Sequence, residues 1–306
     1  MADAVIIWIS GPVLRARTSR ELRVSEAIIV GTNRLLGEVI RLDGEDIVAQ
    51  IYEDTTGLRP GDEIEATGQR LSIRLRPGLL GNIFDGLLRP LADMPGDTVL
   101  PGIRALPPQT LAFAPSRQPG DRIAGGAAIG AVNGGGMHEP VLAPPDVGGV
   151  IVSIVDAGNY ADDATLCVLR DEQGNEHPVT AGQLWPVRRP RPIRRRLPHG
   201  EPLLTGQRII DTLFPVARGS RAALPGGFGT GKTILQESLA KWCDADVIVY
   251  VGCGERGNEM AEVLNEFPTL EDPRSARPLL ERTVIIANTS NMPVAAREAS
   301  IYTGVT

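Results

Sequence analysis

A glycine-rich stretch in the second half of the chain has the residue types and the spacing to hold phosphate groups. Residues 226–233 read Gly-Gly-Phe-Gly-Thr-Gly-Lys-Thr and match the pattern G-x-x-x-x-G-K-[ST] at each fixed position. Glycine tolerates the backbone angles that let a loop wrap closely around a polyphosphate, with the amides pointing at the anion. A glycine-rich turn without a ligand is the simpler alternative. We favour a nucleotide-binding loop, formed by Gly226, Gly227, Phe228, Gly229, Thr230, Gly231, Lys232 and Thr233.

Two residues at the end of this loop suggest separate tasks. Lysine is rare in the chain, since Lys232 and Lys241 are the only lysines among 31 basic residues. A compact ammonium group on a flexible stem reaches under the β- and γ-phosphates, where a planar guanidinium group would not fit. A threonine hydroxyl in a phosphate-binding loop is a ligand for Mg²⁺. We therefore expect Lys232 to neutralise phosphate oxygens and Thr233 to bind the metal.

A second group of polar residues follows the apolar run Val247–Val251. Residues 254–259 read Gly-Glu-Arg-Gly-Asn-Glu, so Glu255 is expected at the carboxyl end of a strand in the same sheet as the phosphate loop. A carboxylate there can polarise a water molecule for in-line attack on a terminal phosphate. We therefore expect Glu255 to be the general base and Arg256 to hold it or a neighbouring subunit in place. The alternatives are that Glu255 only caps the next helix and that Arg256 forms a structural salt bridge.

Alternating strands and helices are expected to position these residues. A mostly apolar stripe at helical spacing predicts a helix after the loop, and it consists of Ile234, Leu235, Ser238, Leu239 and Trp242. The dipole of this helix would favour an anion at its start. Strands that alternate with helices indicate a parallel α/β sheet with its ligands at the carboxyl ends of the strands. The expected strands are Ala222–Leu224, Val247–Val251 and Val284–Ala287, and the expected helices are Gln207–Leu213, Thr233–Cys243, Asn258–Glu266 and Val294–Tyr302.

The first part of the chain has short apolar runs typical of β-strands, with a hairpin signal at Asp43-Gly44. A small β-barrel or another β-meander would fit this pattern, and we favour the barrel. We expect a connector that belongs to the nucleotide-binding domain to follow, and then an inserted β-rich module rather than a flexible glycine linker. The expected domains are a barrel at 1–73, a connector at 74–105, an inserted module at 106–187 and a P-loop domain at 188–306.

Composition limits the classes of function. The chain has 306 residues, a formal net charge of −6 and a pI near 5.3, which argues against a nucleic-acid-binding surface. The Arg/Pro-rich stretch 187–196 is therefore interpreted as a solvated linker. The three cysteines are scattered without metal or disulfide spacing, which fits a reduced cytosolic compartment. Neither a signal peptide nor a membrane span is expected.

Taken together, these motifs resemble the catalytic A subunit of the vacuolar and archaeal type (V-type) rotary ATPases and ATP synthases. The resemblance covers nearly the whole chain and corresponds to the N-terminal portion of that polypeptide. Besides the two motifs above, it rests on matching stretches at 78–86, 185–188, 202–208 and 211–215.

The resemblance implies an N-terminal β-barrel, an inserted bulge domain and a truncated RecA-like P-loop domain. It also implies the phosphate and magnesium roles for Lys232 and Thr233, the catalytic role for Glu255 with Arg256 beside it, and the aromatic loop position for Phe228. Thr230 stands where eukaryotic relatives have a cysteine, so redox control of that kind is not expected. Because the chain stops at Thr306, before a metal-positioning aspartate and the adenine pocket, we expect no turnover by these residues alone.

The expected function is therefore the coupling of ATP synthesis or hydrolysis to H⁺ or Na⁺ transport, with ATP or ADP and Mg²⁺ as ligands. The resemblance implies non-catalytic B subunits in an alternating hexameric ring, stalk subunits, and a cytoplasmic position on a membrane that only partners contact. No nucleic acid is expected. The alternatives are a protein like the F-type β subunit, which the inserted module argues against, a silent nucleotide-binding protein of the ring, and an RNA-translocating ring ATPase.

Overall fold

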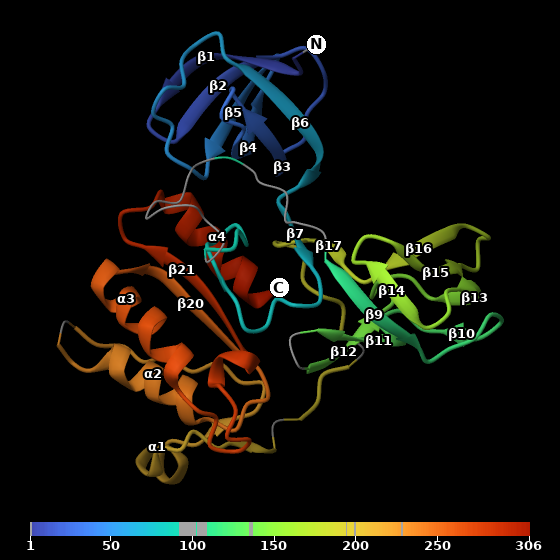
Figure 1. The fold of residues 1–306 in the computed structure, drawn as a ribbon. Helices are drawn as coiled ribbons and strands as arrows, with labels where there is room; N and C mark the ends of the chain where they lie inside the picture. The colour runs from blue at the N-terminus through green and yellow to red at the C-terminus, as the bar shows by residue number, and fades with distance from the viewer. Residues whose placement is uncertain are drawn as a thin grey trace.

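The computed structural model describes residues 2–91, 102, 109–134, 137–193, 195–198, 200–227 and 229–306. A β-barrel, a β-rich unit and an α/β unit follow one another along the chain (Figure 1). The predicted fold class is therefore confirmed. Among the described residues, none of the helices combines the length and the apolar character that crossing a bilayer requires.

The first unit is a closed barrel with the strand order β1-β2-β5-β4-β3-β6. The ring closes where β1 pairs with β6, with Ala4 opposite Ile64. Alternate residues point inward, so Leu14 and Ile28 are fully buried in its apolar core. The barrel rather than the meander is thus confirmed, including the hairpin at Gly44, whose φ is +65°. Its strands are β1 (Ala4–Ser10), β2 (Val13–Thr18), β3 (Glu26–Val30), β4 (Leu35–Asp43), β5 (Asp46–Ile51) and β6 (Glu63–Arg70).

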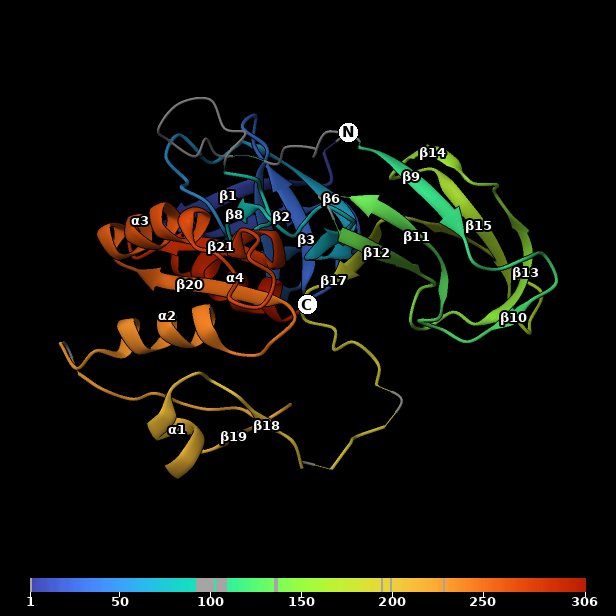
Figure 2. The same cartoon turned by 60° about the horizontal axis from the view of Figure 1, so that its bottom comes forward.

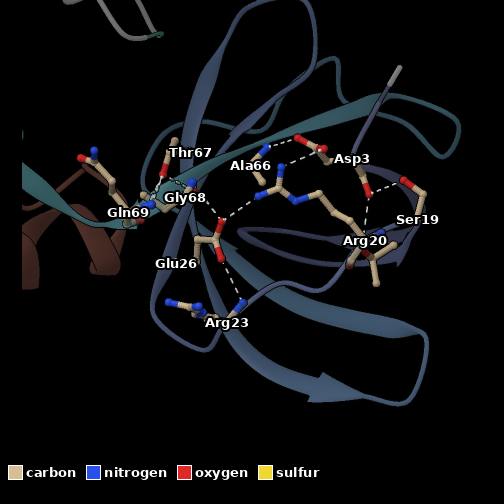
Figure 3. A network of polar contacts seen from close by, with 11 residues as sticks. Asp3, Ser19, Arg20, Arg23, Glu26, Ala66, Thr67, Gly68 and Gln69 are labelled. Atoms are coloured by element: carbon tan, nitrogen blue, oxygen red, sulfur yellow. Dashed lines mark hydrogen bonds and ion pairs between the residues drawn. The ribbon is translucent and has the colours of Figure 1, made fainter.

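Polar contacts tie the seam of the barrel together (Figure 3). The Arg20 guanidinium group lies 3.3 Å from Asp3 and 3.8 Å from Glu26. Glu26 is 5% exposed and accepts hydrogen bonds from the amides of Arg23 and Gly68, both at 3.0 Å. Because these partners come from the loop after β2 and from β6, the Glu26 carboxylate links the start of β3 to a strand that is distant in sequence.

The second unit contains two four-stranded sheets around one apolar core. One sheet has the order β10-β13-β15-β16 and the other β12-β11-β9-β14. The glycine-rich stretch near residue 130 is therefore part of a strand, as the β-rich interpretation required, and not a linker. The strands are β9 (Thr110–Pro115), β10 (Arg122–Ile123), β11 (Ala128–Gly134), β12 (Met137–Leu142), β13 (Gly149–Ile154), β14 (Gly158–Ala161), β15 (Thr165–Arg170) and β16 (Glu176–Thr180).

The α/β unit is a parallel sheet with the order β20-β21-β8, built from distant parts of the chain. Strand β8 (Ile83–Phe84), in the connector, pairs with the middle of β21 (Thr283–Thr289), which also pairs with β20 (Ile248–Glu255). Helix α4 (Val294–Val305) packs on β20 and β21 through Ala295 and Ala299. The remaining elements of this part are α3 (Gly257–Glu266), η1 (Phe267–Thr269) and η2 (Leu279–Arg282).

A buried ionic network joins the barrel to this sheet. Arg89, which is 8% exposed, donates from Nε to Asp85 at 2.6 Å and from Nη1 to Glu53 at 2.7 Å. Glu53 follows the barrel strand β5, whereas Asp85 and Arg89 follow β8. The backbone amide of Gly86 in turn donates to Asn288 of β21 at 3.2 Å. The two units therefore share a continuous polar contact.

The predicted strand at Ala222–Leu224 is wrong, because the structure has no regular element there. A strand needs a neighbour to complete its hydrogen-bond ladder, and no described residue pairs with this segment. Around it lie α1 (Arg208–Leu213), β18 (Pro202–Leu203) and β19 (Val216–Ala217), which Figure 2 shows at the edge of the molecule. A further pair, β7 (Ser72–Leu75) with β17 (Gln183–Pro186), lies beside the second unit.

The helix after the phosphate loop is α2 (Lys232–Trp242), within one residue of the expected bounds at each end. Its predicted apolar stripe is only partly covered, since Ile234 is 65% exposed and Trp242 is 48% exposed. The buried residue of α2 is Glu237, at 6% exposure. The helical periodicity therefore predicted the element but not which of its residues is buried.

Candidate functional site

The phosphate loop turns sharply into α2 through residues with left-handed backbone angles. Gly229 has a φ of +71° and Gly231, the N-cap of α2, has a φ of +81°. A side chain would be strained at both positions. A Cβ at Gly226 would lie 2.5 Å from Oγ1 of Thr230, whose hydroxyl donates to the Gly227 carbonyl at 2.9 Å. These glycines therefore have steric reasons to be there.

Lys232 is the first residue of α2, and its side chain folds back over the loop. Its Nζ donates a hydrogen bond to the carbonyl oxygen of Gly226. The first turn of α2 contains no acidic residue, so nothing there opposes the positive end of the helix dipole. An ammonium group and a helix N-terminus thus point at the same space, a combination suited to an anion.

The loop, the start of α2 and the end of β20 border one cavity of about 810 Å³. It brings together Gly227, Gly229, Thr230, Gly231, Lys232 and Thr233 from the loop with Glu255 and Arg256. Gly226 is held next to it by the Lys232 contact. Phe228 lies outside the described residues. The residues singled out from the two motifs are therefore neighbours, although 22 positions separate Thr233 from Glu255.

Glu255 is the last residue of β20, and its backbone carbonyl accepts a hydrogen bond from the Ser290 amide at 2.8 Å. Its pKa is raised above the ordinary value, first by burial and then by a hydrogen bond with Glu259 and by that residue's negative charge. The charge of Lys232 opposes this rise. A carboxyl group with a raised pKa next to a cation is a candidate for proton transfer at a phosphate site.

Arg256 is the N-cap residue of α3 and is exposed, in an extended conformation with a φ of −69°. It makes no side-chain capping bond to the helix. Arg256 borders the cavity beside Glu255.

Sequence reasoning gave no role to Glu237, Glu259 and Ser290, which also border the cavity. Glu237 is buried in α2, and burial is the largest reason that its pKa is raised. Glu259 lies in the first turn of α3 and Ser290 follows β21. Helical spacing offered one usable signal, because Glu237 lies four positions after Thr233 and therefore on the same face of the helix. The position of Ser290 depends on sheet pairing, which no local pattern reveals.

Three family models match successive parts of the chain. The ATP synthase alpha/beta family, beta-barrel domain, matches residues 6–68, and the ATPsynthase alpha/beta subunit barrel-sandwich domain matches residues 106–188. The ATP synthase alpha/beta family, nucleotide-binding domain, matches residues 206–306. The third match contains both the phosphate loop and Glu255.

The curated relatives are likewise named as subunits of ATP synthases. The chain is 51% identical over 308 residues to the A subunit of the A-type ATP synthase of Methanopyrus kandleri, covering 98% of the chain and 52% of the relative. It is 50% identical over 312 residues to the V-type ATP synthase alpha chain of Anaeromyxobacter dehalogenans, with coverage of 99% and 52%. The chain therefore spans about half the length of the curated relatives it matches.

A solved structure has a similar fold. The assembled ATPase EscN from the type III secretion system of enteropathogenic E. coli matches with a TM-score of 0.59 and 22% identity. The match covers 98% of this chain and 52% of that one. This similarity supports the arrangement of the elements, and the assignment of a reaction must come from the site and the nearer relatives.

Proposed function

Because the chain belongs to the ATP synthase alpha/beta family, we propose that it is part of the catalytic A subunit of a V-type rotary ATPase or ATP synthase. The observation that carries the proposal is the single cavity bordered by Lys232, Thr233 and Glu255. The relatives at about half identity are named as A subunits of A-type synthases or as V-type alpha chains, which favours this assignment over an F-type-like β subunit. We also propose the domain boundaries given above, at residues 73, 105 and 187.

In this function the loop binds the phosphates of ATP or ADP. The backbone amides around Gly229 and Gly231 surround the phosphates, while Lys232 neutralises β- and γ-oxygens and releases its contact with the Gly226 carbonyl. The glycine positions that exclude side chains keep the backbone close to the anion. Arg256, exposed at the rim, is proposed to contact Glu255 or a neighbouring subunit.

Thr233 fits a magnesium ion, because it contributes a hydroxyl oxygen to the cavity that Lys232 borders. Mg²⁺ prefers oxygen ligands and takes only one or two of them from the protein in phosphate sites. When bound, the ion supplies charge neutralisation for the phosphates. Its binding residue in the described part of the chain is Thr233.

Glu255 is proposed to orient a water molecule and accept its proton. The side chain is in the anionic form that this role needs only once the pH rises through its raised pKa. Lys232 favours that form, since its charge lowers the same pKa. The chemistry is mainly positioning and charge stabilisation, as expected for phosphoryl transfer.

We propose that the whole protein couples ATP turnover to H⁺ or Na⁺ transport, in a hexameric ring with B subunits and with stalk subunits on the cytoplasmic face of a membrane. The exposed apolar side chains of the barrel favour such a ring. The barrel exposes Val5, Ile7 and Trp8 on β1 and Ile40 and Leu42 on β4 by 38–49%. Strand β4 is three positions from β1 in either direction around the barrel, so the apolar patches lie on opposite walls. Two patches of this kind suit head-to-tail contacts that close into a ring.

The test compares the two lysines of α2 in the assembled full-length protein. Lys232→Ala should weaken nucleotide binding and reduce turnover by roughly 100- to 1,000-fold, because a phosphate-neutralising cation is removed. Lys241→Ala is the matched control, since Lys241 does not border the cavity and contacts Glu266 at 2.7 Å and Glu237 at 3.8 Å. Equal effects of both substitutions on nucleotide affinity would contradict the proposed site. Hydrolysis that RNA stimulates would instead favour an RNA-translocating ring ATPase.

A further inference from the structure

Strand β20 packs against different helices on its two faces. Ile248 belongs to one apolar cluster with Val263 of α3 and Ala240 of α2, and we call this side the α3 face. Val251 lies on the opposite side, the α4 face, since a Cβ at Gly304 of α4 would lie 2.4 Å from its Cγ2. Successive residues of a strand point to opposite faces. Even-numbered residues of β20 should therefore lie on the α3 face and odd-numbered residues on the α4 face.

This alternation holds as far as Cys253. A Cβ at Gly252 would lie 1.9 Å from the Met260 methyl carbon, which places Gly252 on the α3 face. Sγ of Cys253 donates a hydrogen bond to the carbonyl oxygen of Arg297 at 3.1 Å, so Cys253 lies on the α4 face. If the alternation continued for two more residues, Glu255 would also lie on the α4 face, on the opposite side of β20 from α2.

The alternation breaks at Gly254. Cys253 pairs with Asn288 of β21 and Glu255 pairs with the very next residue of β21, so β20 has one extra residue here. Gly254 has a φ of +80°, in the left-handed region. A Cβ at Gly254 would lie 3.1 Å from Nη1 of Arg297, so it would point to α4, as the side chain of Cys253 does. Two consecutive residues on one face, with one of them unpaired, form a β-bulge.

The bulge brings Glu255 to the α3 face. A Cβ at Gly252 would lie 3.5 Å from Cγ of Glu255, so these two residues, three positions apart, lie on the same side of β20. The backbone amide of Ser290 donates to the Glu255 carbonyl at 2.8 Å and holds the strand in place beyond the bulge. On this face Glu255 borders the cavity that Lys232 of α2 also borders.

We propose that the bulge at Gly254 positions Glu255, because its extra residue turns the carboxyl group from the α4 face of β20 into the phosphate cavity. This inference rests on the proposed function of Glu255 as the group that orients water. Gly254 is a positioning residue that acts through Glu255. Its left-handed backbone angle is the reason for glycine at this position. Space is a weaker requirement, since Nη1 of Arg297 is the far end of a flexible side chain and can shift.

The experiment compares two side chains of similar size at position 254 in the assembled full-length protein. Asparagine tolerates left-handed angles, whereas for β-branched valine such angles are outliers. Gly254→Val should therefore lose the bulge, and hydrolysis should fall by roughly 100-fold or more with ATP affinity nearly unchanged, as expected when a general base is displaced. Gly254→Asn should keep most of the hydrolysis. Gly257→Val is the matched control and should keep it too, because a Cβ at Gly257 meets nothing within 4 Å and its φ is not left-handed.

Two further measurements separate positioning from a general loss of structure. If Gly254 acts only through Glu255, Gly254→Val combined with Glu255→Gln should hydrolyse ATP as slowly as Glu255→Gln alone. A crystal structure of the nucleotide-free complex that carries Gly254→Val should show the Glu255 side chain on the α4 face. The structure of Gly254→Asn should show it in the cavity.

Three results would overturn the proposal: equal losses of hydrolysis in Gly254→Val and Gly254→Asn, a further loss in the double variant, or a Glu255 side chain that stays in the cavity of Gly254→Val. If Gly254→Val does not assemble, Gly254→Ala replaces it. It should hydrolyse ATP more slowly than Gly254→Asn, although alanine is smaller, and the reverse order would count against the proposal. Wild-type hydrolysis by Glu255→Gln would refute the proposed function alone, because the crystallographic position of Glu255 does not depend on turnover.

Discussion

The N-terminal barrel and the segment that carries the phosphate loop differ in how they treat apolar side chains. In the barrel, Leu14 and Ile28 are fully buried, and each strand pairs with a neighbour on both sides. From α1 to α2 the chain instead exposes Ile209, Phe214 and Ile234 by 64–71%. The described residues thus contain a barrel with a buried apolar core and a segment that leaves large apolar side chains exposed, and the phosphate loop lies in the second.

This difference in burial indicates which parts of the molecule determine its stability and which determine its ligand binding. The barrel closes through strands that lie within residues 4–70. The α/β sheet depends on a pairing between Ile83 and Ile285, about two hundred positions apart. The barrel and this sheet meet in the buried contacts of Arg89. Changes in the barrel core should therefore affect the free energy of unfolding, whereas changes in the phosphate loop should affect ligand binding.

The largest effect on stability is expected where the two regions are joined. Arg89→Met should lower the free energy of unfolding by about 3–5 kcal/mol, because Asp85 and Glu53 would keep buried charges without a cation. Chemical denaturation measures this change. Arg122→Met is the control, since Arg122 and Glu172 form a pair at 3.2 Å whose side chains are more than 70% exposed. It should cost less than about 1 kcal/mol, and equal costs would show that the buried network does not join the two regions.

A smaller effect on the free energy of unfolding should distinguish a buried apolar residue of the barrel from an exposed one after the phosphate loop. Leu14→Ala should lower the free energy of unfolding by about 3 kcal/mol, because it leaves a cavity in the closed barrel. Ile234→Ala removes a similar side chain that is 65% exposed, so its cost should stay within about 0.5 kcal/mol. Denaturant titrations of the 306-residue chain compare the two. A large cost at Ile234 would mean that the contrast in burial is wrong.

The sequence predicted much of the barrel because its strands alternate in hydrophobicity and are local in sequence. The exception is β2, which the apolar runs did not indicate, since arginines at 15 and 17 alternate with its inward residues Leu14 and Ala16. The missed signal was the alternation itself, which has the period of a strand. A search for apolar runs alone therefore misses β2, because the outward-facing residues of this strand are basic.

The site was predictable in part, for a different reason. The phosphate loop and Glu255 could be recognised because they lie in short sequence motifs. The glycines of such a motif are needed for the backbone geometry of the loop. The strand expected at Ala222–Leu224 failed because its formation depends on a partner strand, which local residues cannot specify. That Glu259 borders the same cavity as Glu255 depends on how α3 packs, so it became visible only in three dimensions.

The central claim is that Glu255 and the phosphate loop form one catalytic unit. The most direct measurement compares nucleotide binding and hydrolysis by Glu255→Gln with those of the wild type in the assembled full-length complex. We predict nearly normal binding of ATP and a loss of hydrolysis on the order of 100- to 10,000-fold, as expected when a general base is removed. Hydrolysis at the wild-type rate would contradict the claim and remove Glu255 from the mechanism.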